Sequence, residues 1–151
     1  MATGRLSVGQ IKGTPRGSAS HKRYAKSVQA QMAKVTENLN KVIRSIEATS
    51  PLALRYAVKP IYDESQNLVP VDTGKLKASG FIEVRKNTRG VTAVIGYARG
   101  NNPHYAAFVH ERLDLYHEPP TQAKFLEEAA NRHMGKIPAR YADYVRRHVG
   151  L

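Results

Sequence analysis

Residues 68–97 read LVPVDTGKLKASGFIEVRKNTRGVTAVIGY, and the hydrophobic pattern of the chain changes within this stretch. The run LVPV at 68–71 is too short and too interrupted by proline to form a helix, and DTG at 72–74 has the composition of a turn. From Ala78 to Tyr97 the apolar residues alternate or cluster as they do in strands. The stretch therefore predicts a change from helix to sheet.

Two antiparallel strands are the simplest interpretation of residues 81–97. Phe81, Ile82 and Val84 fall on the first strand, and the apolar residues from Val91 to Tyr97 fall on the second. The NTRG sequence at 87–90 predicts a hairpin turn between them, in which Gly90 takes the positive φ that such loops often require.

Upstream of this region, apolar residues alternate at spacings of four and three, which is typical of one face of a helix. The residues are Val28, Met32, Val35, Leu39, Val42 and Ile46. They predict a helix from about Ser27 to Ala48.

A second helix is expected directly afterwards. Ser50 suits an N-cap and Pro51 suits a first helical position, so we expect the first helix to stop here and another to run to about Asn67. Pro60 lies inside this second helix and should remove one backbone hydrogen bond.

The C-terminal third predicts two more helices, one from Thr121 to about Met134 that ends at Gly135, and one from Ala139 to Val149. The YAAFV run at 105–109 is ambiguous between strand and helix, and we favour a short helical or irregular turn. The fold class predicted for the whole chain is α+β. Long N-terminal helices pack on a small antiparallel β-sheet, with C-terminal helices and a flexible basic N-terminal arm.

Positive charge is concentrated at the two ends of the 151-residue chain, whose formal net charge is +12. Residues 1–26 hold six basic side chains and no acidic one, and glycine, proline and serine interrupt any periodicity. We expect an extended arm over 1–26, followed by a single domain over 27–151. The predicted contacts to a partner surface or to DNA are Arg5, Lys12, Arg16, Lys22, Arg23, Lys26, Arg146 and Arg147. The alternative is that the arm only keeps the protein soluble.

Several classes of enzyme have no support in the sequence. The chain has no cysteine, which excludes disulfides, zinc–thiolate sites and thiol nucleophiles. DTGK at 72–75 lacks the glycine spacing and the following Ser or Thr of a phosphate loop, and no serine lies in G-x-S-x-G. We instead expect Asp72 or Thr73 to accept backbone N–H bonds as a cap. We predict no enzyme and no cofactor.

Three histidines, His104, His110 and His117, lie close in sequence to Glu111 and Glu118 and raise the question of a metal site. Their spacing does not match the i, i+4 pair of helical zinc sites. We therefore expect His110 and His117 to hydrogen-bond loop backbone or carboxylates, with no metal bound.

The block LVPVDTGKLKAS at 68–79, preceded by a helix and followed by two strands, resembles the tail-completion and head–tail connector proteins of tailed bacteriophages. These are often labelled minor capsid or tail-component proteins. A second block, YAAFVHE at 105–111 followed by PPTQAKFLE at 119–127, is similar to the region of that family where a Tyr-Ala pair leads through an acidic residue to a proline-containing turn and a Phe-Leu helix. The motif residues are Pro70, Asp72, Thr73, Gly74, Leu76, Tyr105, His110, Glu111, Phe125 and Leu126.

The resemblance covers about residues 50–135 and leaves out the basic arm and the last helix. It implies a structural protein of the virion neck that forms a homomeric ring of six or twelve copies, as adaptor, stopper or tail terminator. Its partners would be copies of itself, portal or adaptor and tail proteins, and non-specifically the packaged double-stranded DNA. The protein would be made in the cytoplasm of the host bacterium and would need no membrane, since no apolar run approaches the ~18 residues of a membrane helix. The alternative function is a basic, non-specific nucleic-acid-binding module.

Overall fold

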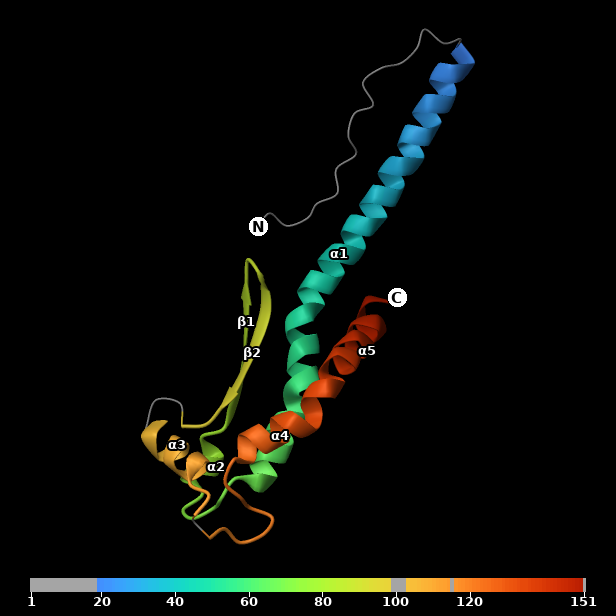
Figure 1. Ribbon diagram of the computed structural model, residues 1–151. Coiled ribbons are helices and arrows are strands. Elements are labelled where there is room, and N and C mark those ends of the chain that lie inside the picture. The colour runs from blue at the N-terminus through green and yellow to red at the C-terminus, as the bar shows by residue number, and fades with distance from the viewer. Residues whose placement is uncertain (1–18, 99–102, 115, 151) are drawn as a thin grey trace. The chain divides into compact units, whose positions relative to one another are not determined.

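The computed structural model describes residues 19–98, 103–114 and 116–150 (Figure 1). The chain divides into two compact units, Met1–Ala48 and Thr49–Leu151, and the predicted domain of 27–151 spans both. The elements are α1 (Ala19–Leu68), α2 (Lys75–Ala78), β1 (Phe81–Asn87), β2 (Gly90–Gly96), α3 (Pro103–Glu111), α4 (Phe125–His133), the 3₁₀ turn η1 (Met134–Lys136) and α5 (Ile137–Val149). The predicted α+β class is confirmed.

Helix α1 corrects two of the sequence predictions. It begins at Ala19, so residues 19–26 are helical where an extended arm was expected. Alanine, lysine and arginine are strong helix formers and are frequent in this segment. Residues 1–18 of the predicted arm lie outside the described part.

The predicted break at Ser50 and Pro51 is also wrong, because both residues lie inside α1. The Ser50 side chain is buried and accepts a hydrogen bond from the Tyr141 hydroxyl at 2.8 Å, so it contacts α5 and does not cap a helix. Pro51 removes a single backbone donor, and its neighbours Ser50 and Ala53 are buried, so tertiary packing supports the helix at this point. The end of the helix agrees with prediction to within one residue.

The predicted hairpin is confirmed. Strands β1 and β2 pair antiparallel, with Phe81 opposite Gly96 and Asn87 opposite Gly90. Gly90 has a φ of 143°, in the region that favours glycine, and the backbone N–H of Arg89 donates to Asn87 Oδ1 at 2.8 Å.

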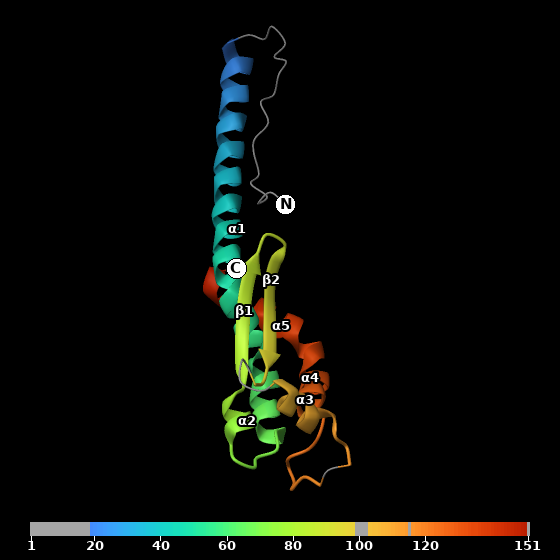
Figure 2. The same ribbon diagram turned by 90° about the vertical axis from the view of Figure 1, so that its left-hand side faces the viewer.

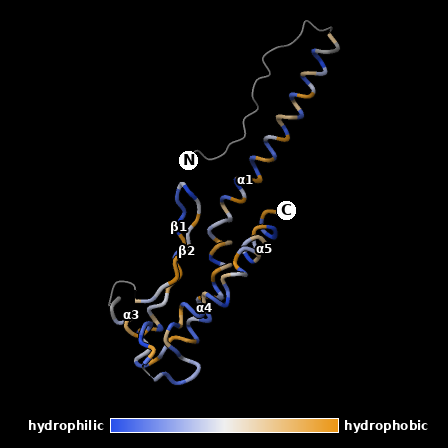
Figure 3. Tube along the Cα trace, in the orientation of Figure 1, coloured by the Kyte–Doolittle hydropathy of each residue, from blue (hydrophilic) through white to orange (hydrophobic). Residues whose placement is uncertain are grey.

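In the second unit the C-terminal part of α1 lies between the hairpin on one side and α4 and α5 on the other (Figures 1 and 2). On the hairpin side, Arg55 donates to the carbonyl of Ile82 at 3.1 Å. On the other side, the rings of Tyr56 and Tyr144 lie 5.2 Å apart. Figure 3 shows hydrophobic residues, in orange, recurring along α1 and the elements that pack on it.

The C-terminal helices differ in their bounds from the prediction. Residues 105–109 belong to α3, so the helical alternative holds for this ambiguous run. Helix α4 starts at Phe125 and not at Thr121, because Lys124 has a φ of 55° that a right-handed helix does not accommodate. Gly135 does not stop the chain's helical path, since it lies in η1, which leads into α5.

The main hydrophobic core of the second unit forms where the turn after α1 meets α3 and α4. Its buried members are Leu68, Val69, Leu76, Val109 and Phe125, with Tyr97, Ala106 and Leu126 packed against them. This core holds the turn after α1 against α3 and α4.

Candidate interaction surface

The 68–79 block forms a turn that is closed by backbone geometry. Gly74, at the N-cap of α2, has a left-handed φ of 76°, and the N–H of Ala78 donates to its carbonyl at 2.9 Å. The predicted side-chain cap from Asp72 or Thr73 is wrong, because no side chain bonds to this helix start. Glycine reverses the chain here at little steric cost, so a capping acceptor is not needed, and Asp72 and Thr73 stay exposed.

The two motif blocks come together, although they are distant in sequence. The backbone N–H of Gln122 donates to the carbonyl of Leu68 at 2.9 Å, and that of Lys124 donates to the carbonyl of His110 at 2.8 Å. The Phe125 ring meets the rings of Tyr97 and His110 edge to face, at centroid distances of 5.1 and 5.0 Å. Backbone bonds and ring contacts thus hold 68–79, 105–111 and 119–127 as one structure.

A short chain of hydroxyls ties α1 to the end of β2 beside this core. Ser65, which is fully buried, donates to the carbonyl of Tyr62 at 2.8 Å, and its Oγ lies 2.7 Å from the Tyr97 hydroxyl. Because Ser65 has only one proton to donate, Tyr97 is the donor to it, and Gln66 Nε2 donates in turn to Tyr97 at 3.2 Å. Burial raises the pKa of Tyr97.

The charged edge of the surface combines α3 with the residue before α4. Lys124 Nζ donates to Glu111 Oε2 at 2.5 Å, and His110 Nδ1 lies 2.9 Å from Glu111 Oε1. The hydrogen bond from Lys124, and next that from His110, lowers the pKa of the Glu111 carboxyl. The expected carboxylate partner is therefore confirmed for His110. It is not for His117, whose Nε2 is buried without a hydrogen-bond partner among the described residues.

Around this core the surface exposes large apolar side chains. They are Val71, Tyr105, Phe108, Leu113 and Tyr116. Two hollows border them and share Asp72. One, of about 670 Å³, is lined by motif residues that include Thr73, Leu76 and Tyr105. The other, of about 340 Å³, is lined by Pro70 and by residues on either side of Glu118.

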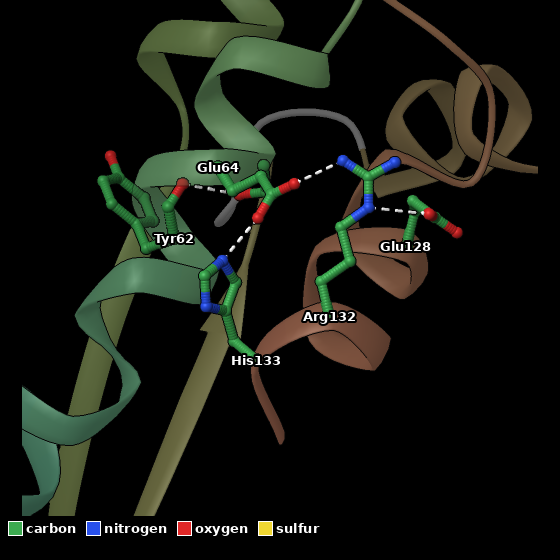
Figure 4. A network of polar contacts seen from close by, with 6 residues as sticks. Tyr62, Glu64, Glu128, Arg132 and His133 are labelled. Atoms are coloured by element: carbon green, nitrogen blue, oxygen red, sulfur yellow. Dashed lines mark hydrogen bonds and ion pairs between the residues drawn. The ribbon is translucent and has the colours of Figure 1, made fainter. Parts of the chain in front are cut away.

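A second polar cluster, which the sequence did not reveal, fastens α4 to α1 (Figure 4). Arg132 donates to Glu64 Oε1 at 2.6 Å and to Glu128 Oε1 at 2.8 Å, and His133 Nε2 contacts the other oxygen of Glu64. The hydrogen bond from Arg132 lowers the pKa of Glu64, against the opposing effect of burial. Glu64 and Arg132 lie far apart in sequence, so no local pattern could have paired them.

The described members of the predicted basic contact set are divided between the two units. Lys22, Arg23 and Lys26 are exposed on the first unit, in α1. Arg146 and Arg147 are exposed on α5 of the second unit, where Arg147 pairs with Asp143. Arg5, Lys12 and Arg16 lie outside the described residues. The assignment of these cations to DNA or to protein contacts stays a prediction.

In the described ranges, no three His, Asp or Glu side chains come together as metal ligands would. No helix of those ranges combines the length and the apolar character needed to cross a membrane. Comparison with known proteins finds no match for this chain among family models, curated proteins or solved structures.

Proposed function

We propose that this chain is a structural protein of the bacteriophage neck that assembles into a homomeric ring of six or twelve copies. The ring would join the portal-bearing head to the tail and surround the DNA channel. The observation that carries the proposal is the convergence of the two motif blocks on one core, with exposed apolar side chains around it.

Exposed apolar clusters of this kind favour assembly over catalysis. Large apolar patches on a protein surface mark sites of contact with other molecules, and aromatic residues are enriched at the centres of protein interfaces. Leu113 is 76% exposed and Tyr116 is 87% exposed, so both would gain burial in contact with a neighbouring copy. The polar groups nearby, Glu111 and Lys124, neutralise one another and suit the rim of an interface.

The exposed cations support contact with DNA as a secondary property. Lys and Arg side chains bind phosphates without reading sequence, which suits a channel through which a genome passes. A ring would collect the cations of all its copies around one axis, whereas a single copy presents only its own. We therefore expect weak DNA binding by the free subunit.

The test is a double substitution on the apolar surface, Leu113→Ser with Tyr116→Ser. Native mass spectrometry of the purified full chain should show a ring of six or twelve copies for the wild type and smaller species for the variant. Met134→Ser is the matched control, because Met134 is exposed on η1, outside both motif blocks, and its loss should leave the ring intact. A wild-type monomer that binds free duplex DNA tightly, with steep salt dependence, would favour the nucleic-acid-binding module instead.

A further inference from the structure

The first unit carries an apolar stripe whose residues follow a seven-residue repeat. If Ala25 is placed at position a, the a and d positions up to residue 46 are filled by Val28, Met32, Val35, Leu39, Val42 and Ile46. Met32, Val35 and Leu39 are 50%, 57% and 46% exposed on the helix, in the part of α1 where Figure 3 shows recurring hydrophobic residues. The stripe extends over three repeats, or about 33 Å of helix.

The charges of this segment avoid the stripe and its borders. All charged side chains between 25 and 46 fall at positions b, c and f, on the outer face; they are Lys26, Lys34, Glu37, Lys41 and Arg44. The bordering e and g positions from 29 to 45 hold only uncharged residues, namely Gln29, Gln31, Thr36, Asn38, Ile43 and Ser45. In coiled coils, charges at e and g choose the partner and the pairing direction.

This pattern identifies the occupant of the stripe. A partner of opposite charge would gain nothing from borders that carry no charge, and like charges on identical helices would repel if they lay at e and g. Identical copies of this segment meet neither difficulty, because each presents the same apolar seam with neutral edges. The helix would also gain stability from such a partner, since most helical stability in proteins comes from the packing of an apolar face.

We propose that residues 25–46 form a parallel coiled coil with the same segment of other copies of this chain, with more than two helices in the bundle. The number of helices follows from the seam: β-branched valine fills the d positions and Leu39 an a position, the arrangement opposite to the one that favours two strands. The parallel direction rests on the proposed ring, because copies related by rotation about one axis point the same way.

Cysteine cross-linking tests this seam directly, because the chain has no cysteine of its own. Leu39→Cys places a thiol at an a position of the full-length protein, where copies in a parallel, in-register bundle bring it together. A short bis-maleimide should then join most chains in pairs. Arg44→Cys, at an outer f position, is the matched control and should stay largely unlinked. Absence of cross-linking at Leu39→Cys would overturn the proposal, as would linkage only when Val35→Cys and Leu39→Cys proteins are mixed, which is the antiparallel outcome because a positions then lie opposite d positions.

A second pair of variants separates this inference from the proposed function. Leu39→Gln should disperse the bundle, whereas Arg44→Gln should not; neither change touches the core of the second unit. A ring of six or twelve copies that survives Leu39→Gln, without cross-linking at residue 39, would contradict the coiled coil and leave the ring standing. A three- or four-chain species that Leu39→Gln disperses would support the coiled coil and contradict the ring. A discrete wild-type dimer would contradict both.

Discussion

The hydroxyls of Ser65 and Tyr97 lie 2.7 Å apart and join the last turns of α1 to the end of β2. Ser65 is fully buried and already donates its only proton to Tyr62, so Tyr97 supplies the proton that it accepts. The Tyr97 ring at the same time packs edge to face on Phe125. One side chain thus connects helix, hairpin and the core of the motif blocks.

Removal of this hydroxyl should destabilise the second unit without changing its packing. Tyr97→Phe keeps the ring and leaves Ser65 Oγ buried without a donor, which should cost about 1–3 kcal/mol in the free energy of unfolding. Urea denaturation measures this difference. Tyr116→Phe, at an exposed position, should change the free energy little, and an equal loss in both variants would contradict the role given to the Tyr97 hydroxyl.

The contact between Glu64 and Arg132 should make stability depend on pH on the acid side. Because Arg132 lowers the pKa of Glu64 in the folded protein, the unfolded chain binds the proton more readily. The ion pair therefore stabilises the folded state fully at pH values above the usual pKa range of glutamate, which lies near pH 4–5. This stabilisation is lost as the pH falls through the lowered pKa of Glu64.

Glu64→Gln removes this effect and should unfold more easily than the wild type at pH 7, with a difference that shrinks at lower pH. Thermal unfolding between pH 3 and pH 7 measures it. Glu118→Gln, at an exposed position in the loop before α4, is the control. A wild-type to Glu64→Gln difference that is constant across this range would show that Glu64 does not titrate as described.

The motif glycine at position 74 should resist substitution for a conformational reason alone. Its φ of 76° is costly for other residues, yet a Cβ at this position would meet no atom within 4 Å. Gly74→Ala should therefore cost about 1–2 kcal/mol. Gly135→Ala is the matched comparison, because a Cβ there is equally unhindered and its φ lies outside the left-handed region. Chemical denaturation of the two variants should separate them, and equal stabilities would show that strain at Gly74 is not important.

The basic residues at the start of the chain should affect assembly in a way that depends on salt. Alanine replacement of Arg16, Lys22 and Arg23 removes three cations, which should weaken assembly most at low ionic strength, because at high ionic strength salt already screens the charge contacts of the wild type. Yields of assembled particles at two salt concentrations measure this effect. Virions that form and retain DNA normally with the triple variant would contradict a role for the arm.

The sequence was sufficient for the features that depend on local chemistry. The hairpin turn at Gly90, the end of α1 and the helical class of the C-terminal third follow from periodicity and turn residues. Features that depend on tertiary contacts were missed. Ser50 was expected to cap a helix from its local sequence. Its actual partner, Tyr141, lies on an element far along the chain, so local sequence could not reveal the contact.

The interaction surface likewise combines features that the sequence predicted with features that only tertiary contacts reveal. The resemblance selected residues that the fold brings together, including Leu76 and Phe125 in one core. It could not supply the Glu64 cluster, because ion pairs between distant helices leave no signature in spacing. The apolar stripe of residues 28–46 was visible as a helix face, but its exposure became known only from the structure.

The most direct test of the central claim is the native mass of the purified full-length protein, alone and with its portal or tail-tube partner. We predict a single closed species of six or twelve copies that binds the partner ring. A protein that stays monomeric in both conditions, and that binds free duplex DNA tightly as a monomer, would contradict the account.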